Sequence, residues 1–295
     1  MVSHKRFDKK TVPTLLKFYS WSWDSKYIDF CLNSSKTHHR SVRFVLRPTS
    51  TSIGILDASA GSTFASSATS TAENPKLWSY WYRNCSESHE SCHKQIHSLA
   101  PFTPDRLIEI FTDDDGNYFS WRLVSRSDIG NVPYLTLSHC WGSSKHLCLT
   151  KKTRDDSAFA RFITYSCLPL SFQHAFIIMF SLGLRFIWID SLCIIQDDPE
   201  DWKAQASMMG LVYKNACCNI AATWAADSNA GYFTKRASTI ITLKFGVELE
   251  PPTTECQVSL ASLYYYGIRE APLNQRGWVM QERFLARRQL SFTQS

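Results

Sequence analysis

The order of apolar and polar positions changes its period along the second half of the chain, and these changes predict the elements. Residues 134–138 and residues 185–190 are short apolar runs that predict buried strands. Residues 171–182 lie between them, are apolar over the length of a helix, and are followed by Gly183, a residue typical of the position after a helix. This order predicts a β-α-β unit with parallel strands.

The next predicted helix has the clearest boundaries. Asp198 is placed to cap its first turn, Pro199 suits the first helical position, and the acidic residues Glu200 and Asp201 follow. One face of this helix carries apolar residues three or four positions apart, which predicts a buried stripe formed by Trp202, Ala206, Met209 and Tyr213. Asn215 is expected to end the helix.

Further elements are predicted downstream: strands at residues 217–222, 258–265 and 289–292, and a helix at residues 277–286. Alternating strands and helices favour an α/β fold with a doubly wound, flavodoxin-like and mostly parallel sheet. We therefore expect an α/β domain over residues 77–295, with its core at residues 133–292.

Two segments precede this domain. Residues 1–48 are rich in aromatic side chains without a clear period, and we interpret them as an N-terminal α+β extension. Residues 49–76 are rich in Ser, Thr and Ala, with too few large apolar side chains to offset the entropy of ordering, so they predict a flexible linker. At the start of the α/β domain, residues 104–110 and 121–124 predict a hairpin.

Composition and charge narrow the class of protein. The 295 residues are 44% hydrophobic and 14% aromatic, which is ample for a packed core. The net charge of +6 comes from scattered Lys and Arg residues, so we expect no nucleic-acid partner. No apolar stretch follows the N-terminus, and the longest apolar region, residues 176–195, is interrupted by Arg185 and Asp190. We therefore expect a cytoplasmic protein without a membrane span.

Ten cysteines without a secretion signal are expected to be reduced thiols, several of which pack as small hydrophobic side chains: Cys167, Cys217 and Cys218. Cys85, His89 and Cys92 share one face of a helix predicted at residues 77–97 and are candidate metal ligands. His93 and His97 face other directions, so this face lacks a fourth ligand. Core packing is the favoured interpretation of the cluster, and a metal site is the alternative.

Polar residues that follow the predicted strands form the candidate binding site, because ligands of such sheets bind at the carboxyl ends of the strands. With two residues of a later segment, these candidates are Ser138, Trp141, Gly142, Asp190, Gln196, Asp197, Arg276 and Trp278. The structural alternatives are that Trp141 anchors the core, that Gly142 forms a turn and that Asp190 caps backbone amides. For Asp190 and Gln196 both interpretations stay open. Trp188 lies inside a strand, so we expect it to pack in the core.

Glu282 is the candidate catalytic residue. It follows Trp278 by four positions and precedes Leu285 by three, so it shares a helical face with apolar side chains. Burial on that face raises the pKa of a carboxyl group, which suits acid–base chemistry or stabilisation of a cationic ligand. The equal alternative is a structural ion pair with a nearby arginine, namely Arg276, Arg283 or Arg287.

A Cys-His nucleophilic pair is a weaker candidate. Cys193 lies near the end of the second predicted strand, and His139 and His146 lie near the end of the first. The spacing does not select such a pair over a packed thiol. The chain has neither a Gly-x-Gly-x-x-Gly nor a Walker A sequence, so neither a standard dinucleotide-binding fold nor a P-loop is supported.

Three tryptophan-bearing blocks occur in order along the chain: Tyr134-Leu-Thr-Leu-Ser-His-Cys-Trp-Gly142, Phe186-Ile-Trp-Ile-Asp-Ser-Leu-Cys-Ile-Ile-Gln-Asp-Asp198 and Arg276-Gly-Trp-Val-Met-Gln-Glu-Arg283. Over roughly residues 78–292 the chain resembles the heterokaryon incompatibility (HET) domain of filamentous fungi. That resemblance implies an effector that triggers regulated cell death when fungal cells of unlike genotype fuse, or in related innate-immune recognition.

The third block is also remotely similar to the TIR domain, in which a helix-borne Glu near a Trp-Cys pair serves NAD cleavage. This chain has Val279 where that Cys would stand, and Gln281 precedes Glu282. The similarity implies that NAD is a substrate, with no bound cofactor, and that Glu282 stabilises the ribosyl cation as nicotinamide leaves. Trp141 or Trp278 would stack on a ring of the substrate.

Two other hypotheses are alternatives to an enzymatic function. In the first, the chain is a non-catalytic signalling module that kills through homotypic assembly, with a second copy or an upstream incompatibility sensor as its partner. The second starts from Ser295, which ends the chain soon after the third block, whereas the family domain usually continues further. It holds that the chain is an inert, truncated copy.

Overall fold

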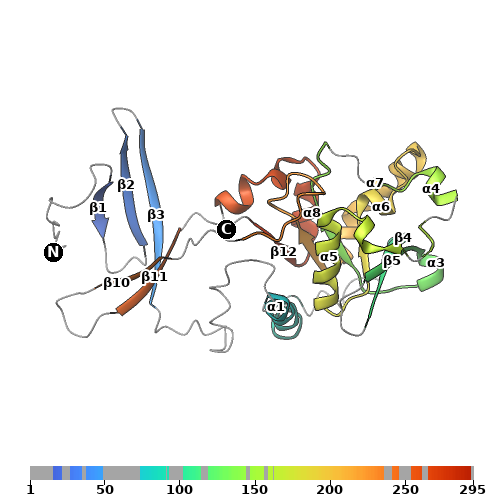
Figure 1. The fold of residues 1–295 in the computed structure, drawn as a ribbon, viewed down its shortest axis with the longest axis horizontal. Coiled ribbons are helices and arrows are strands. Elements are labelled where there is room, and N and C mark those ends of the chain that lie inside the picture. Colours follow the sequence, from blue (N-terminus) through green and yellow to red (C-terminus); the bar gives the residue numbers. More distant parts are fainter. Residues whose placement is uncertain are drawn as a thin grey trace. The chain divides into compact units, whose positions relative to one another are not determined.

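The computed structural model describes residues 16–21, 27–34, 38–48, 74–90, 92, 102–113, 119–143, 147–155, 159–161, 163–235, 241–245, 254–260 and 265–293. The chain divides into two compact units, each of which is described by itself (Figure 1). Unit 1 comprises residues 1–67, 236–266 and 295, and unit 2 comprises residues 68–235 and 267–294. Most of the predicted linker, residues 49–73, lies outside the described residues. The predicted domain boundaries stay a prediction.

Unit 1 is built on an antiparallel five-stranded sheet with the order β1-β2-β3-β11-β10. Its strands are β1 (Leu16–Trp21), β2 (Tyr27–Ser34), β3 (His38–Pro48), β10 (Ile241–Phe245) and β11 (Thr254–Leu260). The strand predicted at residues 258–265 is β11, which begins four positions earlier. Its expected place in the α/β core is wrong, because β11 pairs with β3 of the N-terminal segment.

Unit 2 contains a mixed seven-stranded sheet with the order β12-β9-β6-β8-β4-β5-β7. Its strands are β4 (Arg106–Thr112), β5 (Phe119–Ser125), β6 (Leu135–Ser138), β7 (Ile163–Thr164), β8 (Phe186–Trp188), β9 (Cys218–Ala221) and β12 (Gln289–Ser291). Strands β12, β9, β6 and β8 pair in parallel, and β4, β5 and β7 pair antiparallel at the other edge. The three predicted core strands are therefore parallel neighbours, and the mixed α/β class is confirmed. The doubly wound, flavodoxin-like or TIR-like topology stays a prediction.

The α-helices of unit 2 connect and flank this sheet (Figure 1): α1 (Asn74–Ser88), α3 (Arg126–Ile129), α4 (Lys151–Asp155), α5 (Leu170–Ser181), α6 (Asp190–Cys193), α7 (Pro199–Asn215) and α8 (Val279–Leu285). Helix α7 begins and ends as predicted, and the side chain of Asp198 accepts from the Glu200 backbone N–H at 3.2 Å. Helix α5 lies within one residue of its prediction at each end. Gly183 follows it with φ +70°, a left-handed conformation that glycine adopts without steric conflict.

Strand β6 lies at the centre of the parallel part of the sheet, and all of its residues are buried. Leu135 and Leu137 pack among apolar side chains, while Thr136 and Ser138 point to the opposite face because side chains alternate along a strand. The hydroxyl groups of Thr136 and Ser138 donate to Asn219 Oδ1 of β9 at 2.9 and 3.2 Å. These bonds satisfy polar groups that would otherwise destabilise the buried strand.

Two predictions about burial have different outcomes. Trp188 is completely buried and meets Tyr213 edge to face, so its expected place in the core is confirmed. Among the cysteines, Cys218 is buried as expected, but Cys167 is exposed and its predicted packing is wrong. Cys167 ends a short 3-10 helix, Tyr165–Cys167, where none of the residues is buried. Within the described part of the chain, no helix is long and apolar enough to cross a membrane.

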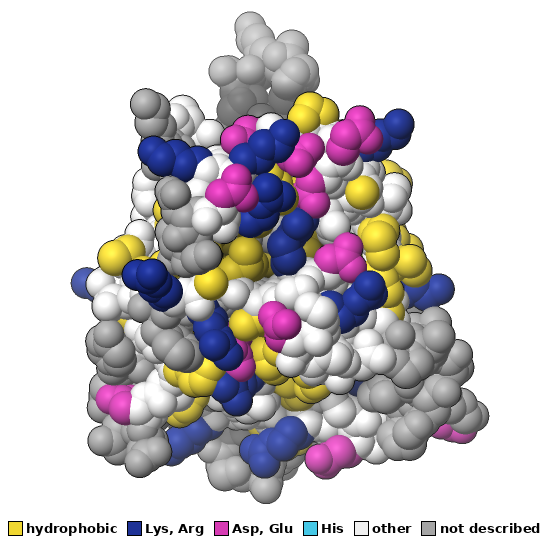
Figure 2. Space-filling view, turned by 90° about the vertical axis from the view of Figure 1, so that its right-hand side faces the viewer, with side chains coloured by type: hydrophobic (Ala, Val, Ile, Leu, Met, Phe, Trp, Pro, Cys, Tyr) yellow, Lys and Arg dark blue, Asp and Glu magenta, His cyan; other side chains and the backbone are white. Residues whose placement is uncertain are grey.

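One face of unit 2 shows how its charges are arranged (Figure 2). Lys and Arg side chains on this face are interspersed with Asp and Glu side chains and with apolar ones. This mixture agrees with the scattered charges of the sequence. The expected absence of a nucleic-acid partner stays a prediction.

Candidate functional site

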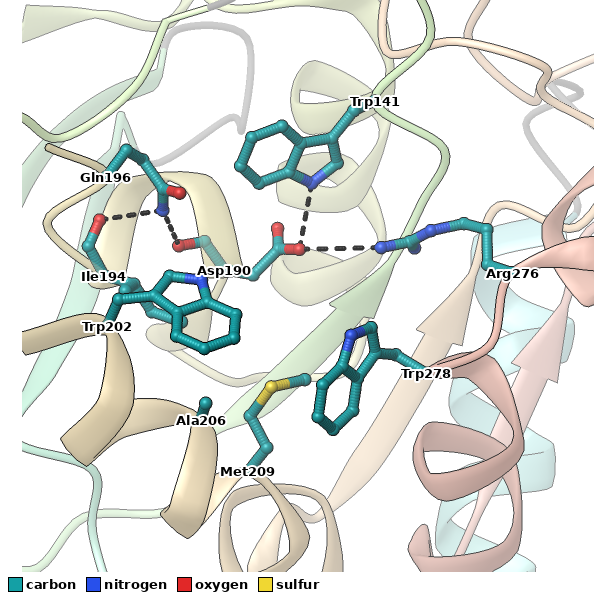
Figure 3. A pocket seen from close by; sticks show the side chains of 9 residues that line it. All are labelled: Trp141, Asp190, Ile194, Gln196, Trp202, Ala206, Met209, Arg276 and Trp278. Carbon is teal, nitrogen blue, oxygen red and sulfur yellow. Dashed lines mark hydrogen bonds and ion pairs between the residues drawn. The ribbon is translucent and has the colours of Figure 1, made fainter. Parts of the chain in front are cut away.

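A pocket of about 230 Å³ lies in unit 2 (Figure 3). It is lined by Trp141, Asp190, Ile194, Gln196, Trp202, Ala206, Met209, Arg276 and Trp278. Trp141 follows the end of β6 and Asp190 follows the end of β8, so the pocket lies where the sheet topology favours ligand binding. Its wall combines three indoles with one carboxylate and one guanidinium.

Asp190 is the residue at which the three tryptophan-bearing blocks meet. Its Oδ2 atom accepts a hydrogen bond from Trp141 Nε1 at 2.9 Å and lies 3.8 Å from Arg276 Nη2 (Figure 3). Its Oδ1 atom accepts from the Ser191 backbone N–H at 2.7 Å and lies 3.8 Å from His139 Nδ1. Asp190 thus binds a backbone amide, as one alternative expected, and also faces the pocket.

Arg276 links Asp190 to a second carboxylate. It follows the 3-10 helix η4 (Pro272–Gln275), and its Nη1 atom donates to the backbone carbonyl of His139. The same Nη1 atom lies 3.8 Å from Glu282 Oε1. One guanidinium therefore lies between two carboxylates, and its carbonyl contact fixes it against the loop that follows β6.

Glu282 lies in the first turns of α8 and is only 2% exposed. Burial raises the pKa of its carboxyl group, and the nearby charge of Asp190 adds to that rise. Arg276, Ser138 and Tyr213 oppose the rise, because they favour the ionised carboxylate. Of the arginines that the sequence offered as ion-pair partners, Arg276 is the one at 3.8 Å. Glu282 does not line the pocket, whereas its ion-pair partner Arg276 does.

Five of the predicted binding residues line the pocket: Trp141, Asp190, Gln196, Arg276 and Trp278. The side chain of Gln196 donates to the backbone carbonyls of Asp190 and Ile194 at 3.1 and 2.9 Å, so it shapes the loop after α6 (Figure 3). Trp278 directly precedes α8 and is half exposed, although Glu282 on the same helical face is buried.

The other predicted binding residues lie off the pocket wall. Ser138 is buried and bonds to Asn219. Gly142 has φ +72°, and a Cβ atom there would lie 2.1 Å from Asp227 Cβ, so it is the turn residue of the structural alternative. Asp197 Oδ1 accepts from the Lys151 backbone N–H at 2.7 Å and caps the start of α4.

The sequence pattern did not predict four of the residues that line the pocket: Ile194, Trp202, Ala206 and Met209. Trp202 was expected in a buried stripe, but it is 46% exposed and lines the pocket. The stripe itself is correct further along α7, where Met209 and Tyr213 are buried. The signal that was missed is the place of Trp202 in the first turn of α7, which begins soon after α6 and the carboxyl end of β8.

The nucleophilic pair has no support from the geometry. Cys193 is completely buried, and burial raises the pKa of its thiol to about 12, which disfavours the reactive thiolate. His139 is also buried and meets Phe172 edge to face. His146 lies outside the described residues. Cys193 is therefore a packed thiol, the interpretation that the sequence favoured.

The fold and the pocket define an α/β domain with an aromatic and charged site at the ends of its parallel strands. The family model described as heterokaryon incompatibility protein (HET) matches residues 134–282. This match covers half of the chain and contains the first two tryptophan-bearing blocks and the third as far as Glu282, so the chain belongs to the HET family. Neither the curated proteins nor the solved structures contain a match to it.

Proposed function

We propose that the chain is a heterokaryon-incompatibility effector that cleaves the bond between nicotinamide and ribose in NAD. The observation that carries this proposal is the composition of the pocket, where Asp190, Arg276 and three indoles face one space. Indoles stack on planar rings, a guanidinium pairs with phosphate, and a carboxylate stabilises a cation on ribose. Planar rings, phosphate groups and ribose are all parts of NAD.

The reaction needs charge stabilisation more than a strong nucleophile. The bond between ribose C1′ and the nicotinamide nitrogen breaks, and its electron pair stays on nicotinamide. Water adds to C1′ and loses one proton, which gives ADP-ribose. Cationic character on the ribose builds up between these events, and a fixed carboxylate in a partly desolvated pocket lowers its energy.

Asp190 is the carboxylate that faces the pocket, so we assign it the contact with the ribosyl cation. Trp141 holds its Oδ2 atom, and Arg276 lies at the same oxygen. We assign Glu282, which the sequence predicted as the catalytic residue, the role of positioning Arg276, because its Oε1 atom lies 3.8 Å from Arg276 Nη1. In this proposal the negative charge of Glu282 keeps Arg276 in place, and Asp190 acts on the substrate.

The size of the pocket limits how NAD would bind. Its volume of about 230 Å³ is below the roughly 300–1,000 Å³ of sites for drug-sized ligands. It therefore suits the nicotinamide-ribose half, with the adenylate half outside. Arg276 is 26% exposed at its side chain, which leaves its guanidinium within reach of the pyrophosphate.

Expression in living cells separates catalysis from other routes to cell death. We expect the parent chain to lower cellular NAD before viability falls, and Asp190→Asn to abolish both effects at equal protein level. Asp155→Asn is the matched control, because Asp155 is 64% exposed at its side chain and lies off the pocket. Cell death with unchanged NAD would contradict the enzymatic proposal.

A second candidate function is killing through homotypic assembly, favoured by the outer face of α8. Met280 is 68% exposed and Phe284 is 73% exposed on this short helix. Neighbouring exposed apolar side chains of this size are typical of interaction surfaces. If assembly kills, Met280→Ser with Phe284→Ser removes toxicity while NAD stays unchanged in parent and variant alike.

A further inference from the structure

A cluster of metal-ligating side chains lies outside the pocket, at the end of α1. The ligand atoms of Cys85, His89 and Cys92 all lie within 4.8 Å of one another. Cys85 belongs to the last turn of α1, and the Cys92 backbone N–H bonds to the His89 carbonyl at 2.9 Å just beyond the helix end. This turn brings Cys92 back toward Cys85, so the grouping follows from the backbone.

We propose that Cys85, His89 and Cys92 bind a zinc ion. The Cys85 and Cys92 sulfur atoms are 3.5 Å apart. Two sulfur ligands at about 2.3 Å from a tetrahedral zinc are about 3.8 Å apart, whereas a disulfide needs about 2.05 Å. The observed separation is close to the first value and far from the second. Thiolate and imidazole together are a donor set that selects zinc over magnesium or calcium.

Arg288 contacts one of the three ligand atoms. Its Nε atom donates to Cys85 Sγ at 3.2 Å. Two thiolates neutralise a divalent ion, so Arg288 would face a centre without net charge. Hydrogen bonds of this kind to a ligating atom orient it and strengthen metal binding.

The fourth position of the tetrahedron is left to water or to a group beyond these three ligands. His93 and His97 lie outside the described residues. His89 is exposed while both cysteines are half-buried, so solvent has access to the cluster. We therefore expect the ion to exchange with chelators in solution.

The site would serve the structure of unit 2 at some distance from the pocket. Arg288 also donates to the Cys217 carbonyl at 3.2 Å, and its own carbonyl accepts from the Asn219 backbone N–H at 2.8 Å. Both partners lie at β9, beside β12. A zinc ion would hold residues 85–92 in the arrangement in which Cys85 meets Arg288, which in turn bonds to the edge of the parallel sheet. Its binding energy would add to the stability of the folded state.

Cobalt titration of the purified full chain under reducing conditions tests the proposal. We expect sulfur-to-cobalt absorption in the near ultraviolet, visible bands typical of tetrahedral coordination, and their loss when zinc displaces about one cobalt ion per chain. Cys85→Ser and Cys92→Ser should each weaken zinc binding at least about tenfold. Cys167→Ser is the matched control, because Cys167 is an exposed thiol outside the cluster, and it should bind as the parent does.

Several results would overturn the proposal. These are a parent chain without the cobalt absorption, and Cys85→Ser and Cys92→Ser variants that fold and bind zinc as tightly as Cys167→Ser. A disulfide between Cys85 and Cys92 in the freshly purified chain, seen as a mass change on reduction, would replace the metal site with a redox pair. Because the cobalt spectrum is recorded on the parent chain, the test does not depend on the folding of any variant.

Discussion

The indole N–H of Trp141 donates to the carboxylate of Asp190 over 2.9 Å, although the two residues are 49 positions apart in the sequence. The bond joins the loop after β6 to the start of α6, and Arg276 approaches the same carboxylate oxygen from the third block. A hydrogen bond to a charged group contributes about 1.5–3 kcal/mol when both partners are held in place. This contact therefore fixes the orientation of the one carboxylate on the pocket wall.

Replacing Trp141 with Phe keeps an aromatic ring and removes the donor. We expect the free energy of unfolding to fall by about 1–3 kcal/mol, because Asp190 Oδ2 loses a charge-assisted hydrogen bond. Urea denaturation measures the change. Trp224→Phe is the control, since Trp224 is 39% exposed and its backbone N–H donates to the Phe292 carbonyl, a bond that the substitution keeps. Equal effects of the two substitutions would remove the special role of the Trp141 bond.

Arg276 and Glu282 should be energetically coupled. Arg276→Gln leaves the buried carboxylate of Glu282 without its cation, so we expect a loss of about 3–5 kcal/mol in unfolding free energy. Adding Glu282→Gln to that variant should restore part of the loss, because the unpaired charge is gone. A double-mutant cycle measures the coupling, expected at about 0.5–3 kcal/mol. Strictly additive effects would show that Arg276 and Glu282 are not energetically coupled across their separation of 3.8 Å.

Stability should depend on pH through Glu282. Its pKa is raised in the folded chain, so the folded state holds this proton more tightly than the unfolded state does. The resulting stabilisation is complete below the ordinary Glu pKa of about 4.3 and is lost as the pH rises through the higher folded value. The unfolding free energy of the parent minus that of Glu282→Gln should therefore fall as the pH rises above the ordinary Glu pKa. A difference that rises with pH would contradict a raised pKa of Glu282 in the folded chain.

His174 should give the opposite dependence. Burial lowers its pKa to about 4, and its Nδ1 atom accepts from the Tyr232 and Phe233 backbone N–H groups at 3.1 and 3.3 Å. The unfolded chain binds the proton near pH 6.5, so stability is present above that value and is lost as the pH falls toward 4. His174→Asn keeps an acceptor without a titrating group. Melting temperatures from pH 7 to pH 4 should fall less steeply for this variant than for the parent.

Helix caps and apolar runs in the sequence correctly predicted several helices and strands. Asp198 and Pro199 mark the start of α7, and the apolar runs of β6, β8 and β9 predicted neighbouring parallel strands. These features depend on caps and periodicity within a few residues. The pairing of β11 with β3 depends on contacts between segments about two hundred positions apart, and no local pattern encodes it.

The candidate site was predictable only in part, for the same reason. Residues after the strand ends were selected by topology, and Trp141 and Asp190 do line the pocket. Glu282 was correctly expected to be buried, but its approach to Arg276 depends on how η4 and α8 pack against each other. Trp202 was missed because helical spacing alone gives the same weight to a residue that faces the core and to one at the open end of the helix.

Nicotinamide release from NAD by the purified chain tests the central claim most directly. With NAD varied around millimolar concentrations, we expect the parent to release nicotinamide and ADP-ribose in equal amounts, at a rate that saturates with NAD. Asp155→Asn should release them at the same rate as the parent. Asp190→Asn should be slower by at least roughly a hundredfold, the scale of loss when a charge-stabilising group is removed. Glu282→Gln, expected to displace Arg276, should be slower to a smaller degree. A folded parent chain that releases no nicotinamide, or an Asp190→Asn variant as fast as the parent, would contradict the account.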